Sequence, residues 1–412
     1  KPTTFTYGDL GGSTFFDTRA SHQRKQTSIN YALSNRNYNN RIMITHSTGL
    51  NQKGWAFSLS GSRRWAEEGY GQGTYYDGWS FFLAADKRFN DRHLLSLAVF
   101  GTPTENGRQG ASVREMLDLA NDNYYNPYWG YQNGKKRNAS VAKSFQPVGM
   151  LTHDWKISDK TTLLTAGSIT YGDRSVSALD WYNAADPRPD YYRYLPSWQL
   201  DLNYRAQLVE EMKNDINKRQ INWDVLYNSN YNSFDVVKDV NGVIGNTVSG
   251  RRSRYILEER VINTTKYNFN STLNSTITEN IIFTAGVTYQ AQKNNYYKKI
   301  NDLLGGDFYV DVNQFAERDF PTNTGAGQND LNNPNRILFK GDKFGYNYDI
   351  NIKKGSVWLQ GVFKFRKIDV FVASEHSYTS FFRKGYVKSG LFPNNSFGKS
   401  TVYNFYNSSI KG

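Results

Sequence analysis

The sequence predicts an all-β fold, a transmembrane antiparallel β-barrel, and three observations point to it. Hydrophobic and polar residues alternate with a period of two in many segments of the chain. The connections between these segments are short in one set and very long in the other. Aromatic residues make up 16% of the chain, although hydrophobic residues make up only 38%, and many tyrosines and tryptophans lie near segment ends.

Composition excludes several other classes. No stretch approaches the roughly 20 apolar residues that a membrane-spanning helix needs. The chain of 412 residues contains no cysteine, so it is not a disulfide scaffold. Its wealth of aromatic residues is atypical of disordered proteins.

The alternation is clearest in residues 267–277, where Tyr267, Phe269 and Leu273 share one face and asparagines and threonines occupy the other. After a short turn, residues 281–290 alternate in the same way. In chain order, the segments with this pattern are residues 55–60, 79–83, 95–99, 151–157, 161–169, 267–277, 281–290 and 344–352. We expect about a dozen strands in all.

The connections differ in length at the two ends of these segments. Tight turns are expected at residues 51–54 and around Asp91, Asp159 and Glu279. Long loops are expected over residues 101–147, 171–264 and 292–343. Outer-membrane barrels have short periplasmic turns, long extracellular loops and aromatic girdles. A soluble β-sandwich also alternates, but it explains neither the unequal loops nor the aromatic residues at the strand ends.

One segment of the longest loop has a helical pattern. Leu202, Ala206, Val209 and Met212 follow a spacing of three to four residues within residues 200–217. We therefore expect a short helix in an extracellular loop.

Several strings resemble TonB-dependent receptors of Bacteroidetes. The strings lie at residues 58–70 (SLSGSRRWAEEGY), 73–113, 123–141 (NYYNPYWGYQNGKKRNASV), 180–198 (DWYNAADPRPDYYRYLPSW) and 383–400. Members of this family form 22-stranded barrels closed by an N-terminal plug domain. The resemblance implies that residues 1–412 are the N-terminal portion of such a barrel, about its first half, with the plug domain and the C-terminal strands outside this sequence.

The resemblance also implies function and partners. It implies an outer-membrane transporter that imports a nutrient (a glycan, a peptide or a chelate) with energy from the TonB–ExbB–ExbD complex. SusC-like members of the family work with a SusD-like surface lipoprotein. The alternative from another class is a passive porin or an adhesin-like outer-membrane barrel.

Two aromatic clusters are candidate ligand sites. The first comprises Tyr124, Tyr125, Tyr128, Trp129 and Tyr131, whose flat faces could stack on sugar rings or peptide groups. The alternative is that these side chains pack the loop against itself.

The second cluster combines acidic, basic and aromatic groups that could bind a polar solute. The alternative is a rigid loop base, stiffened by Pro187, Pro189 and Pro196. Its candidate residues are Trp181, Tyr182, Asp186, Arg188, Asp190, Tyr191 and Tyr192.

Nothing in the sequence indicates an enzyme, a cofactor or a metal site. The carboxylates and the five histidines have no catalytic or metal-ligand spacing. The net charge of +13 fits binding to lipopolysaccharide phosphates or a cationic lumen. Nucleic acid is not expected, because the basic residues form no single patch. The basic clusters are Arg63–Arg64, residues 135–137, Arg251, Arg252 and Arg254, and Lys298–Lys299.

Overall fold

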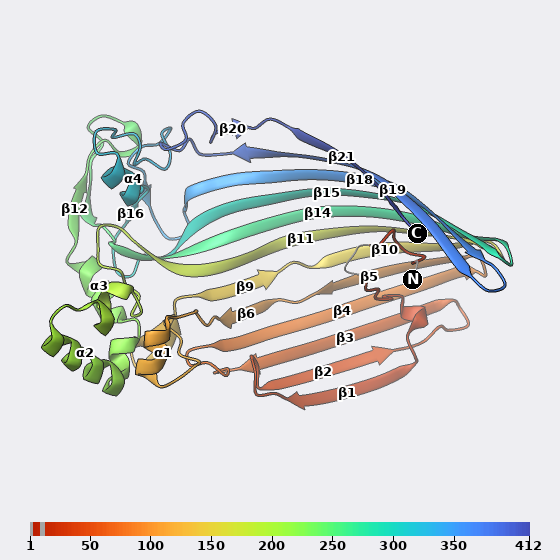
Figure 1. Ribbon diagram of the computed structural model, residues 1–412, viewed down its shortest axis with the longest axis horizontal. Helices are drawn as coiled ribbons and strands as arrows, with labels where there is room; N and C mark the ends of the chain where they lie inside the picture. Colours follow the sequence, from red (N-terminus) through yellow and green to blue (C-terminus); the bar gives the residue numbers. More distant parts are fainter. Residues whose placement is uncertain (1–2, 9–12) are drawn as a thin grey trace.

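A computed structural model describes residues 3–8 and 13–412. One broad, curved antiparallel sheet dominates it, with loops and helices gathered at one end of the strands (Figure 1). Its strands are β1 (Gln26–Leu33), β2 (Asn40–Ser47), β3 (Trp55–Ala66), β4 (Tyr75–Asn90), β5 (His93–Gly101), β6 (Thr104–Gly107), β9 (Val141–Phe145), β10 (Val148–Ser158), β11 (Thr161–Trp181), β14 (Tyr255–Thr278), β15 (Ile281–Asp302), β18 (Lys343–Lys364), β19 (Asp369–Gly385), β20 (Gly398–Lys399) and β21 (Tyr403–Lys411).

The connections carry the remaining elements. The small strand pairs are β7 (Trp129–Gln132) with β8 (Lys135–Asn138), β12 (Phe234–Val237) with β13 (Val248–Arg251), and β16 (Tyr309–Val310) with β17 (Ile337–Leu338). The α-helices are α1 (Arg114–Ala120), α2 (Leu202–Asn214), α3 (Trp223–Tyr231) and α4 (Gln314–Asp319). The 3-10 turns are η1 (Ala20–His22), η2 (Tyr192–Tyr194), η3 (Pro196–Trp198), η4 (Ile216–Arg219) and η5 (Val240–Gly242). Among the described residues, no helix is long and apolar enough to cross a membrane.

Neighbouring strands of the sheet are antiparallel, and most are consecutive along the chain. Prolines interrupt the sheet at two of its strand positions, because proline has no backbone N–H to donate to the neighbouring strand. Pro103 separates β5 from β6, and Pro147 separates β9 from β10. β5 and β6 both lie beside β4, and β9 and β10 both lie beside β11. β5 pairs with β10, and β6 pairs with β9, so each pair occupies one position in the sheet, as one interrupted strand would. With β20 and β21 also sharing one position beside β19, the fifteen strands fill twelve positions. The predicted all-β antiparallel architecture and the expected dozen strands are confirmed.

The register confirms the period of two through the middle of the sheet. Two adjacent rows of paired residues run from β3 to β21. One row is rich in exposed aromatic and aliphatic residues: Phe57, Ala85, Leu97, Leu151, Gly167, Phe269, Tyr289, Gly355, Tyr378 and Tyr406. The row one residue away is small and polar: Ala56, Asp86, Ser96, Thr152, Ala166, Asn270, Thr288, Ser356, Ser377 and Asn407.

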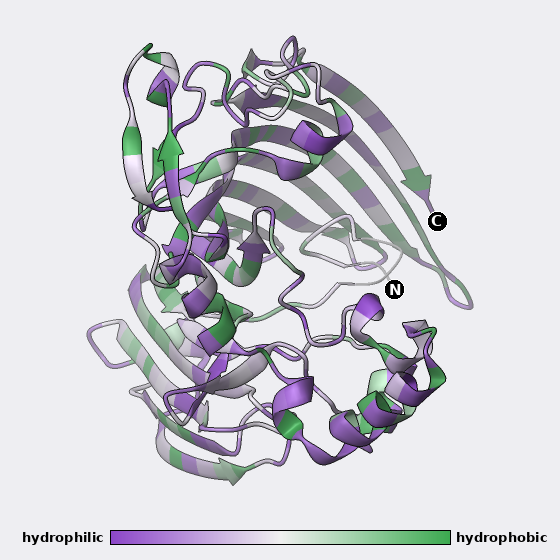
Figure 2. Cartoon of the chain, turned by 90° about the vertical axis from the view of Figure 1, so that its left-hand side faces the viewer, coloured by the Kyte–Doolittle hydropathy of each residue, from purple (hydrophilic) through white to green (hydrophobic). Residues whose placement is uncertain are grey.

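The polar row faces the inside of the curve. The described part of the chain before β1 runs there (Figure 2), as its hydrogen bonds to the wall show. Ser21 Oγ donates a hydrogen bond to the buried carboxylate of Asp86 at 2.6 Å. Asn274 Nδ2 donates to the Thr4 carbonyl at 3.1 Å. The apolar row therefore faces outward, as in a barrel wall that meets lipid.

The long loops are shorter than the sequence predicts, because the strands extend further. β11 continues to Trp181, β14 begins at Tyr255 and β15 continues to Asp302. The 24 residues of β14 span about 80 Å at about 3.3 Å per residue, whereas about 9–11 residues cross a bilayer. The predicted loop limits at residues 171, 264 and 292 are therefore wrong.

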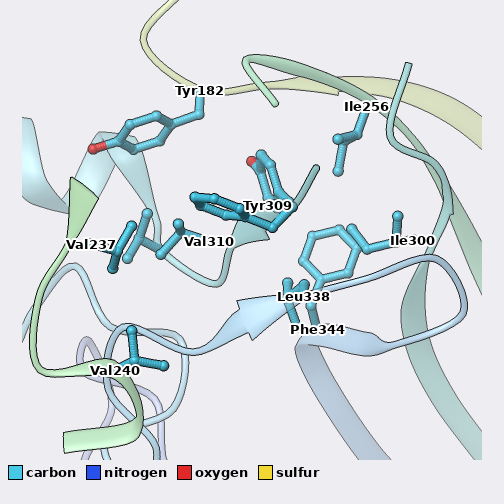
Figure 3. Close-up of a cluster of buried hydrophobic side chains, with 11 residues drawn as sticks. Tyr182, Val237, Val240, Ile256, Ile300, Tyr309, Val310, Leu338 and Phe344 are labelled. Atoms are coloured by element: carbon cyan, nitrogen blue, oxygen red, sulfur yellow. The ribbon is translucent and has the colours of Figure 1, made fainter. Parts of the chain in front are cut away.

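Alternation fails in these extensions because loops cover both faces. On one face, Ile256 packs with Ile300, Tyr309 and Phe344 in a buried cluster (Figure 3). On the other face, Tyr255 and Leu257 pack with residues that include Trp223 of α3. Three consecutive residues of β14 are thus buried, so the hydrophobic period of two disappears there.

The predicted helix is present as α2, which lies within residues 200–217. Asp201 caps it by accepting hydrogen bonds from the backbone N–H groups of Asn203 and Tyr204. The other three α-helices have no counterpart in the sequence prediction.

Candidate functional site

The largest candidate site is a cavity of about 970 Å³ where the wall meets the long loops. On β11, Arg174 and Val176 line it, and on β14, Arg260 and Ile262 do so. Ala166 of β11 and Asn270 of β14 face inward, and the pairing of the two strands is unbroken between them and the cavity. Each of the four residues lies an even number of positions from Ala166 or Asn270 on its own strand, so it faces inward too. The cavity therefore opens on the concave side of the wall, at the end that carries the long loops.

The lining of this cavity is cationic. Its five basic residues are Arg108, Lys143, Arg174, Arg188 and Arg260, and the lining holds no carboxylate. Three of them pair with carboxylates outside the lining, namely Lys143 with Glu105 at 3.1 Å, Arg188 with Asp186 at 2.5 Å and Arg260 with Glu258 at 2.5 Å.

Arg108 and Arg174 differ from the other three cations. Both are exposed, and neither forms an ion pair within residues 3–8 and 13–412. Their guanidinium groups are therefore available to an anion in the cavity.

Buried ion pairs hold part of the cationic lining of this cavity in place. Glu258 is completely buried beneath the cavity. Lys298 Nζ lies 2.7 Å from one of its carboxylate oxygens, and Arg260 Nε lies 2.5 Å from the other. Lys298 also contacts Asp180 at 3.4 Å. Because a buried carboxylate needs such partners, the network holds Arg260 in place at the rim.

Aromatic side chains complete the cavity. Trp181 comes from the end of β11, Tyr296 from β15 and Tyr346 from β18. Tyr296 stacks on Tyr348 with ring centroids 5.2 Å apart. Sequence analysis missed Tyr296, Tyr346, Arg174 and Arg260. Three of these lie where loops were expected, and Tyr346 was taken only as part of an alternating strand.

The structure does not bring the first predicted cluster together on one surface. Trp129 is 0% exposed, with Lys136 Nζ 4.8 Å from its ring centroid and Tyr131 edge-on at 5.3 Å. Tyr125 is buried, its hydroxyl donates to the Arg219 carbonyl at 2.6 Å, and burial raises the pKa of its hydroxyl. Only Tyr128 of this cluster lines the cavity.

Tyr124 lines a second, neighbouring cavity of about 800 Å³. Its ring meets Tyr70 edge-on with centroids 4.4 Å apart. The two cavities share Asn106 and Arg108, so they adjoin. The second cavity is rich in amide and hydroxyl groups, from Asn35, Asn37, Asn106, Gln109, Thr74, Tyr70, Tyr75, Tyr76 and Tyr124.

Some residues of the second predicted cluster line the cavity, and the others pack against neighbouring side chains. Trp181 and Arg188 line the cavity. Tyr182 lies in the buried cluster of Figure 3, and its hydroxyl donates to Glu317 at 2.8 Å. Asp186 holds Arg188 through two hydrogen bonds of 2.9 and 2.5 Å.

The remaining residues of that cluster stabilise the loop itself. Asp190 accepts a hydrogen bond from Ser112 Oγ at 3.0 Å, and burial raises the pKa of its carboxyl. Tyr191 and Tyr192 meet edge-on at 4.8 Å, as do Tyr192 and Trp198. These contacts support the rigid loop base that was the alternative interpretation.

The described residues contain no group of three or more histidine, aspartate or glutamate side chains that could hold a metal ion.

The antiparallel wall, with one apolar and one polar face, short turns at one end and long loops at the other, is the fold of an outer-membrane β-barrel. The chain shares this fold with the ferric citrate transporter FecA in its unliganded form, with a TM-score of 0.52 and 7% identity, over 92% of this chain and 39% of that chain.

Two other solved structures are similar at lower scores. The siderophore receptor PiuA from Acinetobacter baumannii has a TM-score of 0.49 and 10% identity, over 93% of this chain and 44% of that one. The ferric-catecholate import receptor Fiu from E. coli K12, in its open form, has a TM-score of 0.47 and 9% identity, over 90% and 49%. The chain thus spans less than half the length of each of these proteins. No family model and no curated protein matches the sequence.

Proposed function

We propose that the chain is the N-terminal portion of the barrel of a TonB-dependent transporter in the bacterial outer membrane. The fold supports this, and so do the sequence strings that resemble TonB-dependent receptors of Bacteroidetes. β1 and β21 each pair along one side only among the described residues. Since open sheet edges do not occur within a lipid bilayer, further strands would complete the proposed barrel.

The proposed substrate is an anionic nutrient, such as an acidic glycan, an acidic peptide or an anionic chelate. The observation that carries this proposal is the cationic cavity, with five basic side chains and no carboxylate in its lining. Low-dielectric walls strengthen the attraction between such cations and an anion. The rings of Trp181, Tyr296 and Tyr346 could stack on flat groups of the same solute.

Substitution of the two unpaired cations tests the substrate class. We expect Arg108→Gln with Arg174→Gln in the complete protein to weaken binding of an anionic substrate about tenfold or more, because each lost charged hydrogen bond is worth about 1.5–3 kcal/mol. Arg92→Gln removes the same charge from a short turn and should change nothing. Unchanged uptake by the double variant would place substrate recognition elsewhere.

Energy coupling tests the mechanism. Uptake should stop when the proton gradient is dissipated or when TonB is deleted. Uptake that continues under both conditions would favour the alternative, a passive porin. A SusD-like lipoprotein remains a prediction from the resemblance, and co-purification from native membranes would detect it.

A further inference from the structure

A group of lysines lies on the outward face of the wall, directly above its apolar band. Two rows of paired residues follow the row that contains Phe269 and Tyr289, going toward the long loops. The nearer row comprises Ile169, Tyr267, Ala291, Lys353 and Ser380. The next comprises Tyr171, Thr265, Lys293, Asn351 and Phe382. Each of these two rows thus adds one outward lysine, Lys353 on β18 and Lys293 on the adjacent strand β15.

The height of the band places these lysines at the membrane surface. Ile277 and Tyr267 are outward residues of β14 that lie ten residues apart, about 33 Å along the strand. A strand tilt of about 40° reduces this to about 25 Å, the height of the apolar band of such barrels. Lys353 lies in the same row two strands away, so the tilt changes its height by only about 6 Å, and it lies close to the level where lipid headgroups begin.

The lysines line one cavity of about 450 Å³. Lys293 and Lys353 come from β15 and β18, whereas Lys399 comes from β20, which pairs with the upper end of β19. Lys399 Nζ lies 4.5 Å from the centroid of the Phe382 ring. No carboxylate lines the cavity, and Tyr267, Phe382 and Val402 give it an apolar part.

Among the described residues, one of these three charges is neutralised by a carboxylate. Lys293 Nζ lies 3.0 Å from Asp349 Oδ2. In the part of the chain that the structure describes, Lys353 and Lys399 pair with no carboxylate. An anionic group from outside the protein would neutralise both ammonium groups, and the charged headgroups of the bilayer lie at the same height.

Several residues of the basic clusters that the sequence singles out pair with carboxylates of the chain itself. Arg251 pairs with Asp307 at 2.6 Å, and Arg252 pairs with Asp235 at 3.0 Å. Lys298 faces the concave side and binds Glu258. The three outward lysines are far apart in the sequence, so only the register of the sheet brings them together.

We propose that Lys293, Lys353 and Lys399 form a binding site for the phosphate group of an outer-leaflet lipid. The phosphate lies among the three ammonium groups, and the acyl chains extend down the outward face along Tyr267 and Tyr289. This site depends on the placement of the barrel in the outer membrane. It does not depend on which substrate is transported.

Native mass spectrometry of the complete protein in neutral detergent tests this site. The probes are lipid A with two phosphates, lipid A from which the phosphates have been removed, and inorganic phosphate as competitor. We expect the phosphorylated lipid to be retained, and its affinity to fall about tenfold or more in the variant Lys353→Gln with Lys399→Gln, since basic residues at a membrane surface each attract anionic lipid. Lys160→Gln, in a short turn at the opposite end, is the matched control and should bind like the unaltered protein.

Three outcomes would overturn the proposal. These are equal binding by the double variant, equal binding of the dephosphorylated lipid, and displacement of the lipid by inorganic phosphate at similar concentration, which would indicate a site for free phosphate. Lys353→Arg with Lys399→Arg should restore binding if charge is the cause, which excludes misfolding. Substrate uptake by the glutamine variant should be unchanged, so failure of the lipid site and failure of the transport proposal are distinguishable.

Discussion

Asn230 is a fully buried polar residue whose hydrogen-bonding groups are all used. Its amide nitrogen donates to the carbonyl groups of Tyr255, Leu303 and Leu304 at 2.8–3.0 Å. Its oxygen accepts from the backbone N–H groups of Arg254 and Tyr255. One side chain thus attaches α3 to the beginning of β14 and to the end of β15. A buried amide is stable only when its partners are present.

Asn230→Ala should loosen this junction while the wall remains folded. The substitution leaves buried backbone groups without partners, each at a cost of about 1–3 kcal/mol. We expect faster amide hydrogen exchange at residues 254–255 and 303–304. Asn228→Ala, on the exposed side of the same helix, is the control and should leave the exchange unchanged. Equal exchange in both variants would contradict this role for Asn230.

Single residues show how far the sequence could predict the site. The sequence predicts Trp129 as part of a ligand platform and does not single out Arg174, yet Trp129 is completely buried and Arg174 lines the cavity. Trp129 packs against Lys136 and Tyr131 of the same hairpin, a local arrangement that sequence composition did not distinguish from an open platform. Arg174 depends on long-range pairing with Ile262, which no local pattern reveals.

Two ion pairs hold the hairpin of β12 and β13: one closes the open end of the hairpin, and the other attaches it to the segment after β15. Arg252 contacts Asp235 at 3.0 Å, and Arg251 contacts Asp307 at 2.6 Å. Burial alone would raise the pKa of Asp235, but the hydrogen bonds from Arg252 and from the Val236 backbone, together with the positive charges of Arg252 and Arg254, outweigh it, so the pKa is lowered. Hydrogen bonds from Arg251 likewise lower the pKa of Asp307.

Acid should therefore release this hairpin. Because both carboxyl pKa values are lower in the folded state, their contribution to stability is complete above the unfolded value and is lost as pH falls through the folded values. We expect amide protection of residues 234–251 to be present at pH 5 and to be lost as the pH falls below the ordinary range of an aspartate pKa, while β14 and β15 stay protected. Arg251→Gln should weaken the protection already at pH 5. Protection that does not change with pH would contradict the two ion pairs as the attachment.

The elements also differ in how well the sequence predicts them. Eight wall strands, namely β3, β4, β5, β10, β11, β14, β15 and β18, were located in the sequence because their own side chains alternate between an apolar and a polar face. The small strands β7, β8, β12, β13, β16 and β17 have two to four residues each. So short a segment carries no period, and tertiary contacts such as those of Arg251 and Arg252 determine it.

At the scale of the whole molecule, the two ends of the wall are different environments. The long loops contain the buried clusters, the cationic cavity and all four α-helices, whereas the other end has short connections such as the one at Asp159 and Lys160. Because the outward residues in the middle of the wall are rich in apolar side chains, we expect lipid to surround that part of the wall. The sequence already predicted this polarity from loop lengths, since turn residues and chain length between strands are local properties. The sequence could not predict that the strands extend far beyond the bilayer. Loops pack on both faces of these extensions, so hydrophobic and polar residues no longer alternate there.

This polarity predicts the orientation of the protein in the membrane, with the long loops outside the cell. The chain contains no cysteine, so single substitutions supply unique labels within it. Ile244→Cys lies in the longest loop at a residue that is 94% exposed, and Asp159→Cys lies in a short turn at the other end. A membrane-impermeant maleimide applied to intact cells should label Ile244→Cys and should label Asp159→Cys only after the outer membrane is permeabilised. The reverse pattern would turn the barrel upside down and place the cationic cavity in the periplasm, where it could not receive a nutrient from outside.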